Sequence, residues 1–124
     1  MLRLKPLLAA LLAVVATACD SQEPRPNPSL FGGDSRHGAR LIATFGCGAC
    51  HSIPGVRDAR GLVGPPLDNV GSRTIIAGLL PNTPENLLTW LKAPQSVVPG
   101  NAMPNMGLSD HDARDVAAYL YTLR

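Results

Sequence analysis

The chain has 124 residues, of which 11 are basic and 9 acidic, and aromatic residues make up only 4% of it. This length allows one small domain. Arg3 and Lys5 account for the whole basic excess, so the rest of the chain is neutral, which argues against nucleic-acid binding. Few large rings are available to fill a core, so the domain needs another source of apolar volume.

Residues 1–18 have the features of a signal peptide that is removed from the mature protein. Two basic residues near its start are followed by an apolar run over residues 7–16, which is too short to span a bilayer. Small residues then precede Cys19. The sequence therefore predicts export across the inner membrane, with cleavage before Cys19.

The leader also resembles a bacterial lipoprotein signal, in which the cysteine after the cut, here Cys19, receives lipid. Ala16 stands where that signal usually has leucine. An ordinary cut at the same bond would leave Cys19 without lipid, but lipidation explains an odd cysteine in an exported protein. We expect a periplasmic protein that is anchored to the membrane through Cys19.

Residues 19–32 are predicted to form a proline-rich tether. Pro24, Pro26 and Pro28 alternate with polar residues, a pattern that favours extended polyproline II over packed structure. A merely disordered N-terminus is the alternative. A tether would hold the domain that follows, residues 33–124, near a membrane surface.

Residues 33–124 are predicted to form an all-α domain of short helices joined by long loops rich in Gly and Pro. The first helix begins near Asp34 or Ser35, either of which can cap it. Gly38 lies on its apolar face, where it would allow another helix to approach closely. No stretch alternates as a strand, and loops this long suggest that the chain wraps a prosthetic group.

Two further helices are predicted, over residues 84–92 and from Ser109 towards the C-terminus. Ser109 and Asp112 form a capping box for the last helix, and Arg124 suits the negative end of its dipole. The first and last helices are expected to cross, with Gly38 admitting Tyr119.

The string Cys47-Gly48-Ala49-Cys50-His51 is the C-x-x-C-H signature of covalent c-type haem attachment. On a helical turn, residues three apart share a face, so both thiols can reach the two vinyl groups along one haem edge. His51 can then ligate the iron. A haem would also supply the apolar volume that the composition lacks.

Two other uses of this string fit the surrounding sequence less well. A redox-active C-x-x-C pair normally follows a strand, whereas the segment before Cys47 has the pattern of a helix. A structural zinc site needs two more ligands at short spacing, and only His37, His111 and the distant Cys19 remain.

A second axial ligand is expected beyond the helix over residues 84–92. Met103 and Met106 lie on an irregular loop, and Pro99 and Pro104 bracket Met103 and would preorganise it. A methionine usually serves core packing, but a thioether can close the second face of a haem and raise its potential. Met103 is the first candidate and Met106 the runner-up.

Residues 33–124 resemble a class I mono-haem cytochrome c. The run Gly64-Pro65-Pro66-Leu67 is similar to the family's Gly-Pro-x-Leu loop, and the spacing from Pro94 to Met103 matches the family's methionine loop. The resemblance implies the cytochrome c fold around one covalent haem c. It also implies that the Pro65 carbonyl accepts a hydrogen bond from His51 and that Met103, rather than Met106, ligates the iron. Around the haem, the resemblance implies that Leu67 packs on the ring, that Arg73 lies near a propionate and that Trp90 lies on the methionine side.

Within this family, the domain resembles the compact bacterial cytochromes that accompany haem–copper oxidases more than the lysine-rich soluble carriers. The runs at residues 50–55, 102–104 and 118–123 carry it. The implied function is a one-electron carrier of a respiratory chain, not an enzyme in itself, although it could be a subunit of an oxidase complex. Its implied partners are a quinol-oxidising complex or dehydrogenase as donor and a terminal oxidase as acceptor.

Three alternatives remain at the level of sequence. A haem enzyme or gas-binding protein would leave the sixth iron position open. A bis-histidine carrier would use His111, which the pattern places in the first turn of the last helix, facing solvent. A thiol-redox or metal-delivery protein would use Cys47 and Cys50 without haem.

Overall fold

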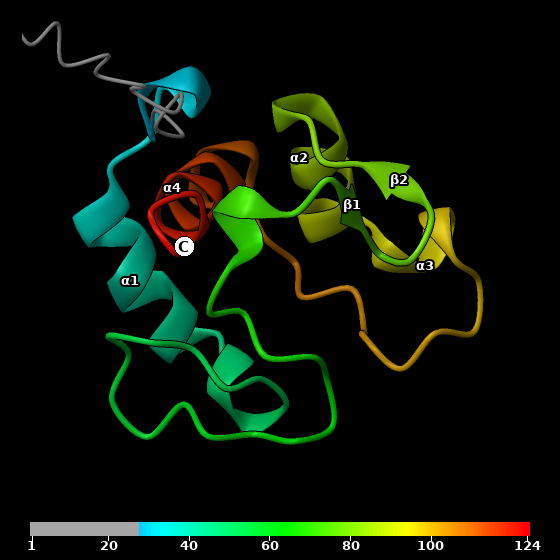
Figure 1. The fold of residues 1–124 in the computed structure, drawn as a ribbon, viewed down its shortest axis with the longest axis horizontal. Coiled ribbons are helices and arrows are strands. Elements are labelled where there is room, and N and C mark those ends of the chain that lie inside the picture. Colours follow the sequence, from blue (N-terminus) through cyan, green and yellow to red (C-terminus); the bar gives the residue numbers. More distant parts are fainter. Residues whose placement is uncertain (1–27) are drawn as a thin grey trace, which may run out of the picture.

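The computed structural model describes residues 28–124 of the chain (Figure 1). The predicted signal peptide over residues 1–18, the candidate lipid site Cys19 and residues 20–27 of the predicted tether lie outside the described residues. Within residues 28–124, no helix is both long enough and apolar enough to cross a membrane.

Helices and loops dominate the described residues, which agrees with the predicted all-α class. The α-helices are α1 (Ser35–Thr44), α2 (Pro84–Lys92), α3 (Pro94–Val97) and α4 (Asp110–Leu120). Single 3-10 turns are η1 (Pro28–Phe31), η2 (Cys47–Ala49) and η3 (Val70–Ser72). Two short antiparallel strands, β1 (Ile75–Ile76) and β2 (Leu80–Pro81), pair Ile75 with Pro81.

The expectation that the domain has no strand was therefore wrong at one hairpin. β1 and β2 have two residues each, too short for any alternation of apolar and polar side chains to show in the sequence. The sequence also missed α3: Pro94 ends α2 as expected, but it then serves as the first residue of a new helical turn.

The helix starts follow from side chains that accept backbone hydrogen bonds. The Asp34 carboxylate accepts from the backbone N–H groups of Arg36 and His37 and so begins α1. Thr83 caps α2. Ser109 and Asp112 form the predicted reciprocal capping box at the start of α4. α4 ends at Leu120, so Arg124 lies beyond the helix and not in its last turn.

The first and last helices pack against each other more extensively than any other pair of elements, and Figure 1 shows α4 nearly end-on beside α1. The backbones meet at Gly38, where an added Cβ would overlap the carbonyl of Asp115. From the sequence, the Tyr119 side chain, and not the Asp115 backbone, was expected to pack against Gly38. The Tyr119 hydroxyl donates to the Pro54 carbonyl at 2.5 Å.

The packed domain also includes residues that the sequence assigned to the tether. Phe31 in η1 is 1% exposed, and its ring meets Tyr121 edge-on at a centroid distance of 4.7 Å. Arg114 on α4 donates to the Phe31 carbonyl at 3.2 Å. An apolar ring that follows the proline run, ahead of the predicted start of the domain at residue 33, thus lies in the core.

Gly38→Ala tests the helix crossing. Alanine favours a helix by about 1 kcal/mol over glycine, but its Cβ overlaps the α4 backbone, and such overpacking costs about 1–3 kcal/mol. We expect a net fall in the free energy of unfolding, measured by denaturant titration. Thr44→Ala, on the exposed part of the same helix, should change it by less than about 0.5 kcal/mol. A Gly38→Ala protein as stable as the parent would contradict the close crossing.

Candidate functional site

A cavity of about 570 Å³ opens between η2, the β1–β2 hairpin, α2 and the loop that follows α3. A smaller apolar recess of about 80 Å³ continues from it towards the core, and is lined by Ile42, Leu67, Leu87 and Leu120 among others. Seven residues line both the cavity and the inner recess: Cys47, His51, Arg73, Ile76, Ala77, Trp90 and Met103.

The two cysteines of the C-x-x-C-H string lie in and just after η2. This turn follows α1 and begins after Gly46, whose φ of 71° is the left-handed conformation that glycine adopts without strain. The backbone N–H groups of Cys50 and His51 both donate to the Cys47 carbonyl, at 3.2 and 3.0 Å. Both cysteines line the cavity as free thiols, and burial raises the pKa of the Cys47 thiol.

The orientation of the His51 imidazole is set by the loop that faces it. Nδ1 lies 2.7 Å from the Pro65 carbonyl oxygen, which can only accept, so Nδ1 carries the proton and Nε2 keeps its lone pair. A Cβ at Gly64 would overlap the His51 ring. The backbone N–H of Gly64 donates to the Cys50 carbonyl at 2.7 Å, which ties this loop to the C-x-x-C-H turn. Glycine is thus required for the loop to lie against the imidazole.

Met103 lines both the cavity and the inner recess, and its backbone is held on both sides. Its N–H donates to the Asn101 side chain at 2.7 Å, and its carbonyl accepts from the Gln95 side chain, also at 2.7 Å. Gln95 also donates to the Asn101 carbonyl at 2.9 Å. Met106 lines the cavity but not the recess.

Gln95 and Asn101 are residues that sequence reasoning missed. Gln95 lies in α3, and Asn101 follows a glycine with a φ of 78°. Their amide side chains satisfy carbonyl groups that an irregular loop leaves unpaired. A signal was present, since Asn101 lies inside the segment that Pro99 and Pro104 bracket and Gln95 lies a few residues before it, but nothing in their spacing says which carbonyls they reach.

The remaining predicted residues also line these spaces. Leu67 packs on the core at the recess, and Trp90 on α2 reaches both spaces. The Arg73 guanidinium donates to the Pro66 carbonyl and, at 2.9 Å, to the Asn69 side chain. Arg73 therefore braces the loop that carries Pro65 while it lines the cavity. His111 lies elsewhere, on α4, and lines neither space.

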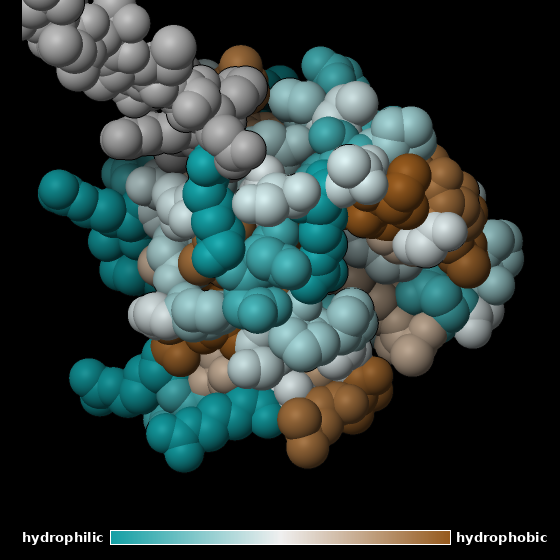
Figure 2. Space-filling view, in the orientation of Figure 1, coloured by the Kyte–Doolittle hydropathy of each residue, from teal (hydrophilic) through white to brown (hydrophobic). Residues whose placement is uncertain are grey.

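Exposed apolar side chains surround the cavity mouth. Val63 is 72% exposed and Ile75 48% exposed, and both line the cavity. Leu62 and Leu79 beside them are also exposed. Figure 2 shows apolar surface over the β1–β2 hairpin and again at the lower edge of the molecule. We call these four residues the apolar rim.

The donor set of the cavity fits a haem. Two thiols three residues apart, one imidazole with a free Nε2 and a thioether line a mainly apolar space. Neither cavity nor recess holds the further cysteines or histidines that would complete a four-ligand zinc site within the described residues. The turn that carries the thiols follows a helix and not the strand of a thiol-redox protein.

Comparison with known proteins agrees with this donor set: residues 35–124 match the family model for cytochrome c. The chain belongs to the cytochrome c family. This membership implies that it binds haem c and serves electron transfer, which confirms the cytochrome part of the resemblance seen in the sequence.

The chain is also similar to proteins named cytochrome c oxidase subunit 2. It is 36% identical over 91 residues to that of Alkalihalophilus pseudofirmus, and 33% identical over 94 residues to that of Bacillus subtilis. Each match covers 73% of this chain but only 26% of the relative. The chain therefore corresponds to about a quarter of the length of these relatives.

Gly64→Ala tests the contact between the loop and the imidazole. The added Cβ displaces the His51 ring and weakens its hydrogen bond to Pro65, so the haem-loaded protein should lose about 1–3 kcal/mol of stability. The measurement is denaturant unfolding followed by haem absorbance. Leu62→Ala, two residues away and 91% exposed, is the control and should change stability by less than about 0.5 kcal/mol. Equal stabilities of the two variants would show that the position of the His51 imidazole does not depend on the absence of a side chain at Gly64.

Proposed function

We propose that this protein is a one-electron carrier of a respiratory chain, with one covalent haem c whose iron is ligated by His51 and Met103. The observation that carries the proposal is the cavity, where two thiols, an oriented imidazole and a braced methionine come together. When bound, the haem supplies an iron that alternates between ferric and ferrous states.

The attachment role falls to Cys47 and Cys50, which would form thioether bonds to the two vinyl groups of the haem. The proximal role falls to His51. Donation from its Nδ1 to Pro65 fixes the ring orientation and raises the basicity of Nε2, as an outer partner does for most metal-binding histidines.

Met103 is proposed over Met106 as the second ligand. Met103 reaches the inner recess beside Leu67 and Trp90, and its backbone has hydrogen bonds on both sides. A thioether from a preorganised loop closes the iron's sixth position and favours the ferrous form, which raises the reduction potential. With both axial positions taken, electron transfer is favoured over oxygen activation or gas binding.

Leu67, Trp90 and Arg73 would complete the haem pocket. Leu67 and Trp90 supply apolar packing against the ring, with Trp90 on the methionine side. Arg73 is 27% exposed, and its guanidinium would offer positive charge to a propionate while it braces the Pro65 loop.

The proposed acceptor is a haem–copper oxidase, and the proposed donor is a quinol-oxidising complex or a dehydrogenase. The similarity to proteins named cytochrome c oxidase subunit 2 supports the acceptor. The apolar rim around the cavity mouth is suited to a partner protein that must come close to the haem edge. Whether the protein acts as a free carrier or an oxidase subunit, we propose a periplasmic location with a lipid anchor on Cys19.

Covalent attachment is tested by a denaturing gel stained for haem. We expect the parent protein to stain, because only a covalently held haem survives denaturation, and we expect the Cys47→Ala, Cys50→Ala double variant to lose the stain. Cys19→Ala is the matched control and should keep it, while mass spectrometry of its mature N-terminus shows no lipid. An unstained parent protein would support a haem-free thiol protein instead.

Met103→Ala and Met106→Ala form a matched pair for the sixth ligand. Met103→Ala should lose the weak far-red band of methionine–iron ligation, bind carbon monoxide when reduced and have a lower reduction potential, because a thioether stabilises ferrous iron. Met106→Ala should keep the band and not bind carbon monoxide. The reverse pattern would assign the ligand to Met106. Carbon monoxide binding by the parent would favour a haem enzyme or gas-binding protein.

A further inference from the structure

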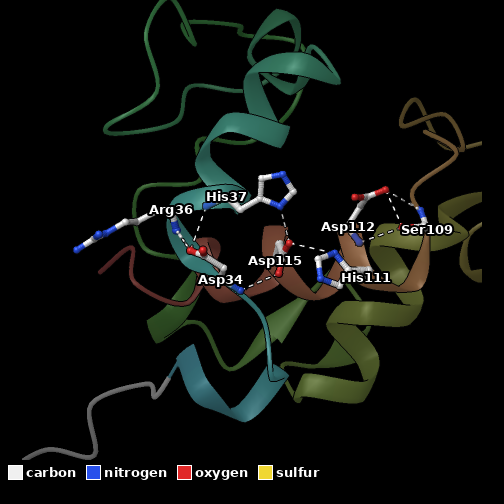
Figure 3. A network of polar contacts seen from close by, with 7 residues as sticks. All are labelled: Asp34, Arg36, His37, Ser109, His111, Asp112 and Asp115. Atoms are coloured by element: carbon white, nitrogen blue, oxygen red, sulfur yellow. Dashed lines mark hydrogen bonds and ion pairs between the residues drawn. The ribbon is translucent and has the colours of Figure 1, made fainter.

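A second cluster of potential ligands lies where α1 and α4 cross, outside the haem cavity. His37 comes from α1, and His111 and Asp115 come from α4, one helical turn apart (Figure 3). One ligand atom of each residue lies within 4.8 Å of those of the other two. None of the three lines the cavity or the inner recess, so the proposed electron-transfer function does not use them.

The Asp115 carboxylate is the fixed centre of this cluster. It is only 1% exposed, and its Oδ1 accepts from the backbone N–H of Asp34 at 2.7 Å. Burial alone would raise its pKa, but hydrogen bonds from His37 and Asp34 outweigh burial and the pKa is lowered. Burying an ionised carboxylate and holding it in one orientation costs free energy, and in this domain the fold already provides that ligand.

The second carboxylate oxygen faces both imidazoles. Asp115 Oδ2 lies 2.7 Å from Nδ1 of His37 and 3.3 Å from Nδ1 of His111. His37 is 37% exposed and His111 78% exposed, so the cluster is open to solvent on one side. Figure 3 shows the His37 and His111 rings reaching Asp115 from the two helices.

We propose that His37, His111 and Asp115 form a binding site for a divalent transition-metal ion of the zinc type. Two imidazole nitrogens and one carboxylate oxygen, with water in a fourth position, form a common donor set for Zn²⁺. This set lacks the thiolates of a soft-metal site and the many oxygens that Ca²⁺ or Mg²⁺ requires.

The spacing of the atoms suits such an ion after a small adjustment. Metal–ligand bonds of about 2.0–2.1 Å in tetrahedral geometry place neighbouring ligand atoms about 3.3–3.4 Å apart. The His111–Asp115 distance of 3.3 Å already has this value, and the 2.7 Å His37–Asp115 hydrogen bond would have to lengthen. Each imidazole would coordinate through Nδ1. The proton that His37 donates from Nδ1 to Asp115 would then leave that atom, and the neutral ring would carry its proton on Nε2.

A bound ion would link the first helix of the domain to the last. It would add a bond across the crossing where Gly38 meets the Asp115 backbone. Because the site exists only when α1 and α4 are packed together, binding stabilises the folded state. This inference does not depend on the identity of the sixth iron ligand or on the redox partner.

The test is a calorimetric titration of the metal-free, haem-loaded protein with Zn²⁺ at about pH 7.5, because protons compete with the metal for its ligand atoms at lower pH. We expect saturable binding of one Zn²⁺ at this site and a thermal midpoint that rises with Zn²⁺ concentration. Mg²⁺ at the same concentrations should give neither effect. The haem absorption spectrum should stay unchanged, since the site lies outside the haem cavity.

His111→Gln is the decisive variant, because this exposed side chain can be replaced without disturbing the core. Its Zn²⁺ affinity should fall about tenfold or more, as losses around metal sites usually do. Arg36→Gln, an exposed residue next to His37 and outside the cluster, is the matched control and should bind as the parent does. Absence of saturable Zn²⁺ binding, or equal affinity in His111→Gln and the parent, would overturn the proposal and leave a hydrogen-bonded His–Asp–His network.

Discussion

The close crossing of α1 and α4 is the contact on which the rest of the domain depends. Gly38 allows the two backbones to touch at Asp115. Because α1 ends shortly before the turn that carries Cys47 and Cys50, this contact also positions that turn relative to α4. The buried face of α4 forms part of the wall behind the inner recess. A bulkier residue at Gly38 would therefore shift the attachment turn relative to the wall behind it.

Irregular segments form most of the cavity, and each is braced by backbone carbonyl groups that accept hydrogen bonds. Pro65 accepts from His51, Pro66 from Arg73, and the Met103 carbonyl from Gln95. Proline suits such positions because its fixed φ limits the loop while its carbonyl stays free to accept. A high content of proline and glycine is unusual for a packed core, but in this domain it forms restricted loops that line the cavity.

The sequence predicted those features that depend on neighbouring residues. Capping at Ser109, and at Asp34 as one of the two candidates for the first helix, follows from short side chains at fixed offsets from the helix they begin, and the structure has both. The contacts of Tyr119 and Phe31 were not predicted correctly. Phe31 was assigned to the tether, and Tyr119 was expected at Gly38, because the partner of such a ring depends on how distant segments pack.

By itself, the sequence determined the cytochrome c family, the C-x-x-C-H turn and the order of the main helices, because each is a local pattern. Only the tertiary structure decided that the Asp115 backbone contacts Gly38 and that the Asp115 carboxylate lies near both His37 and His111. His111 and Asp115 are one helical turn apart, but His37 and Gly38 lie far from both in the chain, and no spacing rule links the two pairs. Their meeting follows from backbone contact at a glycine, which brings a carboxylate of one helix to the imidazole of another.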